Sequence, residues 1–225
     1  MMQSMVRRAR TIITGFVHHI AHYSMDGRDV LTNTDDFKTY LEYLEKFSKK
    51  NGLSLWAYCL LPDHIRLVAV PRDVGALAAA VRDTHAAYAG YANWRGLTSG
   101  RVWKNRFSSC VLDDMFVWSA VRLVESLPVR LGLVKKAEKY RWSSAAPHCG
   151  LRQDAVLTAS FPPPGVIENW PEWLAGAESE SALEKRLLLN TRTGHPFGGT
   201  AFIEELEKQT GRILRPQKRG PKPRA

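Results

Sequence analysis

The chain has 225 residues, and its 44% hydrophobic content is enough for one domain with a buried core and an extension. Its 32 lysines and arginines against 22 acidic residues give a net charge of +10, which favours a polyanionic partner, either nucleic acid or an acidic membrane surface. No run of about 18 apolar residues could span a membrane, and no apolar segment follows the basic residues of positions 1–10 as in a secretory signal, so we expect a cytoplasmic protein.

The first strand is expected over residues 11–24, which are rich in β-branched and aromatic side chains. Side chains alternate between the two faces of a strand, so three of its residues share one face: His18, Ile20 and His22. His19 points to the opposite face. His19 and His22 match neither a zinc site nor a catalytic triad, so we expect these two to be structural or to face a bound nucleic acid.

The elements that follow are predicted from hydrophobic spacing and capping residues. They are a helix over 35–51, strands over 53–60 and 65–70, a helix over 75–94, a strand over 102–112 and a helix over 115–126. Asp113 and Asp114 are expected to cap the last helix, and Pro128 to stop it. Tyr88 and Tyr91 lie on an apolar helix face and are expected in the core. The order β-α-β-β-α-β-α predicts an α+β fold, a ferredoxin-like or RRM-like antiparallel sheet with packed helices.

A tight corner at Pro62-Asp63 joins two of these strands, and the second strand carries His64 and Arg66. Residues two apart on a strand project from the same face, while Ile65 between them points into the core. Two histidines in this geometry would offer two imidazoles to one divalent cation, but a guanidinium is protonated and has no lone pair to donate. One imidazole alone is a poor site for Mg²⁺ or Mn²⁺. We therefore expect no metal here, a hydrogen-bonding His64, and an Arg66 that is either an inert surface charge or a phosphate contact.

The composition changes after Gly150, which predicts three regions. They are a domain over 1–150, a helical extension over 151–210 and a basic tail over 211–225. The elements expected in the extension are a proline-rich linker over 161–165, a short element over 170–174, and helices over 181–189 and 200–209. Thr200 is expected to cap the last helix. The three cysteines are far apart and odd in number, and are expected to be reduced thiols: Cys59, Cys110 and Cys149.

The tail has six basic residues and no acidic one, so we expect it to be disordered until it meets a phosphate backbone. These residues are Arg212, Arg215, Lys218, Arg219, Lys222 and Arg224.

Several short motifs occur in one order along nearly the whole chain and resemble the REP-associated tyrosine transposases, a bacterial branch of the single-tyrosine HUH transposases. The matching segments are Arg7–Arg10, Val17–Ile20, Ala57–His64, Val102–Phe107, Leu127–Val134, Tyr140–Ala145 and Thr193–Gly198, followed by the basic tail. The resemblance implies an HUH transposase-like core in which paired histidines hold Mg²⁺ or Mn²⁺ against the scissile phosphate. It also implies a helix tyrosine that attacks this phosphate, and single-stranded DNA next to a hairpin as the substrate.

Two catalytic positions of the family differ in this chain. The first HUH histidine corresponds to His64, but the second corresponds to Arg66. The family's tyrosine lies in a helix motif Arg-Tyr-Ile-Glu-x-Asn-Pro-Val, which reads Arg-Leu-Val-Glu-Ser-Leu-Pro-Val over 122–129 here, so Leu123 takes the nucleophile position. Leucine has no hydroxyl, and Ser119, one turn earlier, has the character of an ordinary helix serine. The resemblance therefore predicts no catalytic residue, no metal ligand set and no cofactor, with His64, Arg66 and Leu123 as degenerate positions.

Contacts with DNA are expected from basic side chains along the chain, and from a tryptophan that either stacks on bases or belongs to the core. The expected contact residues are Arg7, Arg8, Arg10, His64, Arg66, Trp103, Lys104, Arg106, Arg130, Arg192, Arg212, Arg215, Lys218, Arg219, Lys222 and Arg224.

Three functions compete at this point. The first is a DNA-binding protein of transposase descent that no longer cleaves, and that binds or regulates at hairpin, repeat or promoter DNA. The second is an active transposase or single-strand endonuclease that uses another hydroxyl or ligand set. The third is an RNA-binding module that stacks bases on an open sheet. The first implies a nucleoid-associated protein whose partner is hairpin, single-stranded or duplex promoter DNA, with no membrane partner and with a homodimer as an alternative to a monomer.

Overall fold

The computed structural model describes residues 11–158, 167–176 and 182–215. At their centre is a four-stranded antiparallel sheet with the strand order β2-β3-β1-β4. The strands are β1 (His18–Tyr23), β2 (Leu53–Leu60), β3 (His64–Pro71) and β4 (Ser108–Val111). One strand lies between the two strands that each crossover helix joins, and this arrangement confirms the predicted ferredoxin-like α+β fold.

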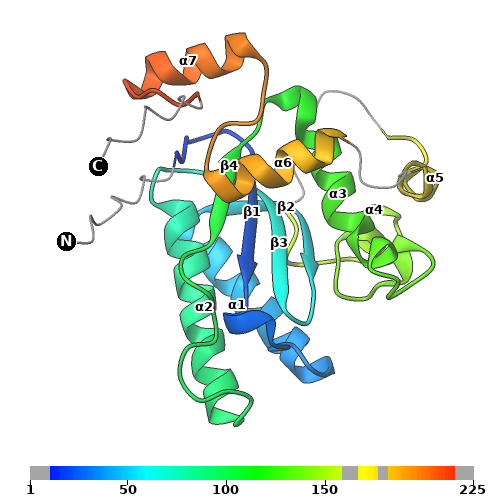
Figure 1. Cartoon of the computed structure of the whole chain (residues 1–225). Helices are drawn as coiled ribbons and strands as arrows, with labels where there is room; N and C mark the ends of the chain where they lie inside the picture. The colour runs from blue at the N-terminus through cyan, green and yellow to red at the C-terminus, as the bar shows by residue number, and fades with distance from the viewer. Residues whose placement is uncertain (1–10, 159–166, 177–181, 216–225) are drawn as a thin grey trace, which may run out of the picture.

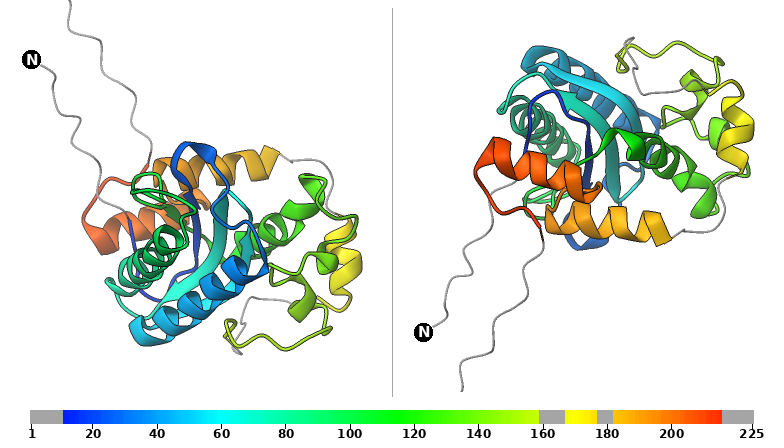
Figure 2. Two further views of the ribbon diagram at one scale, coloured as in Figure 1. Left: turned by 90° about the horizontal axis from the view of Figure 1, so that it is seen from below. Right: turned by 90° about the horizontal axis from the view of Figure 1, so that it is seen from above.

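Helices α1 (Thr34–Asn51) and α2 (Ala76–Trp94) cover one face of the sheet (Figure 1 and Figure 2). The cap of α1 is Asn33, whose side-chain oxygen accepts hydrogen bonds from the N–H groups two and three residues further on. The helix ends at Gly52, whose φ of 69° is a left-handed conformation that glycine adopts without strain. Both helices therefore begin and end within a residue or two of the predicted positions.

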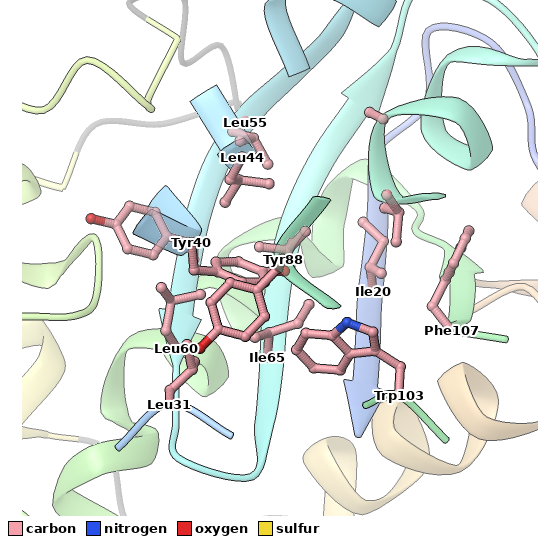
Figure 3. Packing of buried hydrophobic residues seen from close by; sticks show 14 of the residues in the cluster. Ile20, Leu31, Tyr40, Leu44, Leu55, Leu60, Ile65, Tyr88, Trp103 and Phe107 are labelled. Carbon is pink, nitrogen blue, oxygen red and sulfur yellow. The ribbon is translucent and has the colours of Figure 1, made fainter. Parts of the chain in front are cut away.

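Aromatic and aliphatic side chains fill the space between these helices and the sheet. Figure 3 shows Ile65 of β3 beside Tyr88 and Trp103, with Tyr40 of α1 next to them. Ile65, Tyr40 and Tyr88 are fully buried. The predictions that Ile65 and Tyr88 belong to the core are confirmed, and Tyr91 packs at the border of the same cluster.

A chain of polar groups crosses this core. The Nε2 atom of His22 lies 3.2 and 3.3 Å from the carbonyl oxygens of Lys104 and Asn105 and donates to them. With both rings neutral, Nδ1 of His22 accepts from the Nδ1–H of His85 at 2.7 Å, and Nε2 of His85 accepts from the Tyr40 hydroxyl at 2.7 Å. Burial lowers the pKa of His85 well below its ordinary value, which keeps this ring neutral. His22 is therefore a structural residue, one of the two roles expected for it.

Helices α3 (Val117–Arg130) and α6 (Ala182–Thr193) cover the opposite face, and α6 lies across β4 and β1 in Figure 1. Leu187 of α6 is fully buried in the apolar cluster that also holds the inner side of α3. Arg130 and Glu184 fasten the two helices through two hydrogen bonds of 2.5 Å each. Both terminal nitrogens of Arg130, a predicted DNA contact, thus bind a carboxylate within the chain.

Short segments of the chain cover both edges of the sheet. Beyond β4, the N–H of Phe197 donates to the carbonyl oxygen of Val111 at 2.9 Å. Beyond β2, the N–H of Leu60 donates to the carbonyl oxygen of Trp142 at 2.9 Å. The remaining elements are η1 (Met25–Gly27), η2 (Asp114–Phe116), η3 (Ala137–Lys139), α4 (Ala145–His148), α5 (Trp170–Ala175) and α7 (Thr200–Thr210).

The described part of the C-terminal extension packs directly on the sheet and its helices. The buried carboxylate of Glu125 in α3 accepts a hydrogen bond from the indole N–H of Trp170 at 2.8 Å. After α7, Leu214 is buried against Leu206. The guanidinium of Arg215 binds Glu207 at 2.5 Å. Residues 211–215 therefore pack against α7, so the expected disordered tail does not begin at residue 211.

Two predicted strands are shorter than expected. β1 starts at His18 because Gly15, with a φ of 77°, turns the chain ahead of it. β4 starts at Ser108, and the φ of 54° at Asn105 is incompatible with a strand that begins at residue 102.

The helices that follow extend further than predicted. Pro128 lies inside the last turn of α3, where a proline removes one N–H bond without stopping the helix. α6 continues to Thr193 instead of ending near residue 189. The cap of α7 is Gly199, which has no side chain to form a cap bond, and the predicted cap Thr200 is the first helical residue.

Within the described ranges, no helix is long and apolar enough to cross a membrane. The three cysteines are free thiols, as expected, with Cys59 and Cys110 buried and Cys149 partly exposed.

The polar chain in the core generates a stability prediction. Tyr40→Phe removes the hydroxyl that donates to His85 and leaves a buried ring nitrogen without a partner, which should lower the free energy of unfolding by about 1–3 kcal/mol. Urea denaturation measures this loss. Tyr43→Phe on the same helix is the matched control, because Tyr43 is only partly buried. Equal stability of the two variants would contradict the proposed hydrogen bond.

Buried histidines should make the protein less stable in mild acid. Burial lowers the pKa of His18 from 6.5 to about 4, and lowers those of His19 and His85 well below their ordinary value. Below pH 6.5 the unfolded chain therefore binds protons that the folded chain does not, and stability falls as pH falls. The expected loss between pH 7 and pH 5 is roughly 2 kcal/mol for each histidine. Urea midpoints at these two pH values test this, and an unchanged midpoint would refute it.

Candidate functional site

His64 and Arg66 project from β3 on the face of the sheet that α3 and α6 cover. Ile65 points to the opposite face, into the core under α1 and α2. Antiparallel pairing places Tyr23 of β1 opposite His64, and the two rings stack with their centroids 5.0 Å apart. Nδ1 of His64 donates to the Asp63 carboxylate at 2.7 Å. Burial and the nearby charge of Arg66 lower the pKa of His64. His64 is thus a neutral, hydrogen-bonded histidine, as expected.

Arg66 is only 8% exposed, so it is not the surface charge that one alternative expected. Its Nη2 donates to the Tyr23 hydroxyl, and its guanidinium carbon lies 5.2 Å from the centre of that ring. Its Nε is buried and has no hydrogen-bond partner, and no carboxylate of the described residues forms an ion pair with it. Burial lowers the pKa of Arg66, yet a guanidinium stays protonated at neutral pH. Arg66 is therefore a buried cation without a paired anion.

A pocket of about 350 Å³ lies over Arg66, between the sheet and α6. Its lining residues are Ala21, Tyr23, Arg66, Ser108, Lys185, Leu188, Leu189, Thr191 and Arg192. Three of these residues are basic and none is acidic, and two of the basic ones, Lys185 and Arg192, are exposed on α6. The pocket therefore favours an anion, and a guanidinium at its base suits phosphate oxygens. Arg66 and Arg192, both predicted contacts, come together here.

Under α6 lies a second buried polar group on the same face of the sheet. Nδ1 of His19 is 2.7 Å from the hydroxyl of Thr191, and the Cys110 thiol is 3.2 Å from the same hydroxyl. Burial and the charge of Arg66 lower the pKa of His19 well below its ordinary value, so this ring is neutral. Nε2 of His19 is buried without a partner. These contacts attach α6 to β1 and β4 and hold the wall of the pocket in place.

The nucleophile position of the implied family is occupied by an apolar side chain. Leu123 is 4% exposed and packs on the same sheet face among the residues under α3. Ser119 is partly buried on the same helix. A divalent metal does not fit the hairpin: His64 offers one imidazole, and the neighbouring Arg66 is a cation that would repel it. No group of three or more His, Cys, Asp or Glu residues in the described ranges could hold a metal ion.

The other predicted contacts are spread over the molecule. Trp103 is buried and stacks on His22 and His85, so the structure supports the core alternative for this residue. Lys104 and Arg106 are exposed in the loop before β4. Arg212 is half-buried and Arg215 is ion-paired at the end of α7. The predicted contacts outside the described residues are Arg7, Arg8, Arg10, Lys218, Arg219, Lys222 and Arg224.

Tyr23 and Lys185 are among the pocket residues that were not predicted from the sequence. Alternation along the first strand places Tyr23 on the face of His19, so pairing this strand with the hairpin would have revealed it. Lys185 carries no such signal, because its position depends on how α6 packs across the sheet. The open aromatic sheet expected of an RNA-binding module is not found in the described part of the chain, since helices cover both faces.

No family model and no curated protein sequence matches this chain. Among solved structures, a REP-associated tyrosine transposase bound to a REP hairpin is similar at 16% identity and a TM-score of 0.57, covering 72% of this chain and 99% of that one. A candidate transposase from Deinococcus radiodurans R1 is 19% identical, with a TM-score of 0.32, over 51% of this chain and 92% of that one, and we base no argument on it. The chain therefore shares the fold of this solved REP-associated tyrosine transposase, in agreement with the fold that the resemblance of its sequence motifs implies.

Proposed function

We propose that this protein binds single-stranded or hairpin DNA through its transposase-like fold, does not cleave it, and acts as a binder or regulator at repeat or promoter DNA. The observation that carries the proposal is the buried, unpaired Arg66 at the base of a basic pocket, at the position of a metal ligand in the resembling family. The similar structure that holds a REP hairpin supports hairpin DNA as the partner. The proposal also includes that the protein associates with the nucleoid and that it forms a homodimer.

Arg66 can replace the role of a divalent metal in binding, though not in catalysis. A metal ion offers a phosphate oxygen positive charge in a fixed position, and a guanidinium offers positive charge together with directed N–H donors. Tyr23 and the walls of the pocket hold this guanidinium in place. A phosphate can therefore bind without a metal, but Leu123, at the family's nucleophile position on α3, has no hydroxyl with which to attack it.

One observation favours a second candidate, a single-strand endonuclease with a different nucleophile. The hydroxyl of Tyr23 accepts a hydrogen bond from Arg66, and Tyr23 lines the pocket. Attack of this oxygen on a phosphorus bound at Arg66 would form a 5′-phosphotyrosine. It would also break the bond to the 3′ oxygen, which leaves as a hydroxyl and takes up the phenol proton.

Metal-independent binding is the first expected result. EDTA should leave the affinity for hairpin DNA with a single-stranded flank unchanged, while Arg66→Ala should weaken it by about 1–3 kcal/mol, the range for a charged hydrogen bond. Fluorescence anisotropy measures both effects. Arg101→Ala, an exposed arginine that does not line the pocket, is the control for net charge, and thermal denaturation shows whether Arg66→Ala still folds. A large loss of affinity in EDTA would contradict the proposal.

The second expected result is that the wild-type chain forms no covalent adduct with single-stranded DNA in Mg²⁺ or Mn²⁺. Arg66→His combined with Leu123→Tyr should restore some adduct, and neither change alone should suffice, because the metal and the nucleophile act as a unit. Denaturing gels detect the adduct. A wild-type adduct that disappears in Tyr23→Phe would instead establish the endonuclease candidate.

A further inference from the structure

We infer that the pocket between the sheet and α6 binds the terminal phosphate of a DNA strand, a phosphomonoester, in preference to a phosphodiester within the strand. This inference rests on the proposed binding of DNA and specifies which part of it enters the pocket.

The charge of the pocket matches a terminal phosphate. Arg66, Lys185 and Arg192 supply three positive charges, and no lining residue is acidic. The carboxylates next to these residues are already engaged, Asp63 by His64 and Glu184 by Arg130. A phosphomonoester carries about −1.5 to −2 charges at pH 7, whereas an internal phosphodiester carries one. The pocket thus presents more positive charge than an internal phosphate can neutralise.

The buried guanidinium supplies the second observation. Arg66 is more than nine-tenths buried, its Nε has no partner, and its side chain lines the pocket. Arg130 and Arg152 also have a buried Nε without a partner, but each is ion-paired with a carboxylate, whereas Arg66 forms no ion pair among the described residues. A buried guanidinium without a carboxylate partner therefore indicates a missing anion. A terminal phosphate offers three non-bridging oxygens, one more than a phosphodiester, to satisfy Arg66 and the two basic residues of α6 together.

The size of the pocket is compatible with the end of a strand. Its volume of about 350 Å³ is at the small end of the ~300–1,000 Å³ range for ligand pockets, which is room for about one nucleotide. An internal phosphate needs one path for the strand to enter and another to leave, whereas a terminal phosphate needs one. Tyr23 is 43% exposed, and it lies with Leu188 and Leu189 along the pocket, where the terminal base can pack.

The test compares one hairpin oligonucleotide with a single-stranded flank in three forms: with a 5′-phosphate, with a 3′-phosphate, and with hydroxyls at both ends. Wild-type protein should bind one phosphorylated form about tenfold more tightly than the unphosphorylated form. Lys185→Ala and Arg192→Ala are exposed substitutions on α6, and each should remove most of this preference. Lys208→Ala on α7 changes the net charge equally, lies outside the pocket, and should keep the preference.

The three forms separate this inference from the proposed function. Equal affinity of wild-type protein for all three forms, or a preference that persists in Lys185→Ala and Arg192→Ala, would overturn the terminal-phosphate site while leaving DNA binding intact. Failure to bind any of the forms would overturn both proposals. The form that binds most tightly identifies the end of the strand that enters the pocket.

Discussion

The central constraint on this molecule is that helices cover both faces of its sheet, so the side chains of β3 are buried in alternation on two sides. Ile65 meets this constraint with an apolar side chain, but His64 and Arg66 have to find polar partners in an interior. His64 does so through Asp63, and Arg66 does so only in part, through the hydroxyl and ring of Tyr23. Among the described residues, Nε of Arg66 and Nε2 of His19 are buried without a partner, and these two groups distinguish the α6 side of the sheet from an ordinary core.

Because α6 is one of the helices that cover the sheet, it has two structural roles. Its inner face completes the core through Leu187, and its Thr191 hydroxyl forms a hydrogen bond with Nδ1 of His19. Its outer side carries Lys185 and Arg192 toward the opening of the pocket. The ion pair between Arg130 and Glu184 fixes α6 relative to α3, so the basic residues are held by the fold and not by a loose segment. Arg130, which was expected to contact DNA, therefore helps to hold in place the basic residues that line the pocket.

Most of the fold could be predicted from the sequence because its signals are local. The glycine after Asn51 and the apolar spacing before it define α1, and alternation defines the hairpin around Pro62-Asp63. The candidate site was predictable only in part. The positions of His64 and Arg66 follow from one strand, whereas the burial of Arg66 and the place of Lys185 depend on packing between segments more than a hundred residues apart. Trp103 illustrates the same limit. Its place in the sequence is compatible with stacking on bases or with burial in the core, and only its contacts with His22 and His85 show that it is buried.

The covered edges of the sheet restrict how this protein can associate with others. An exposed edge strand presents a row of free N–H and C=O groups, to which another chain can add a strand. Here the segment around Phe197 pairs with the last residue of β4, Val111, and the segment around Trp142 pairs with the end of β2 at Leu60. Growth of the sheet by strand addition, whether in a dimer or in an aggregate, is therefore blocked at both ends until these segments detach. Any second subunit has to be recognised through side chains on the helices and loops.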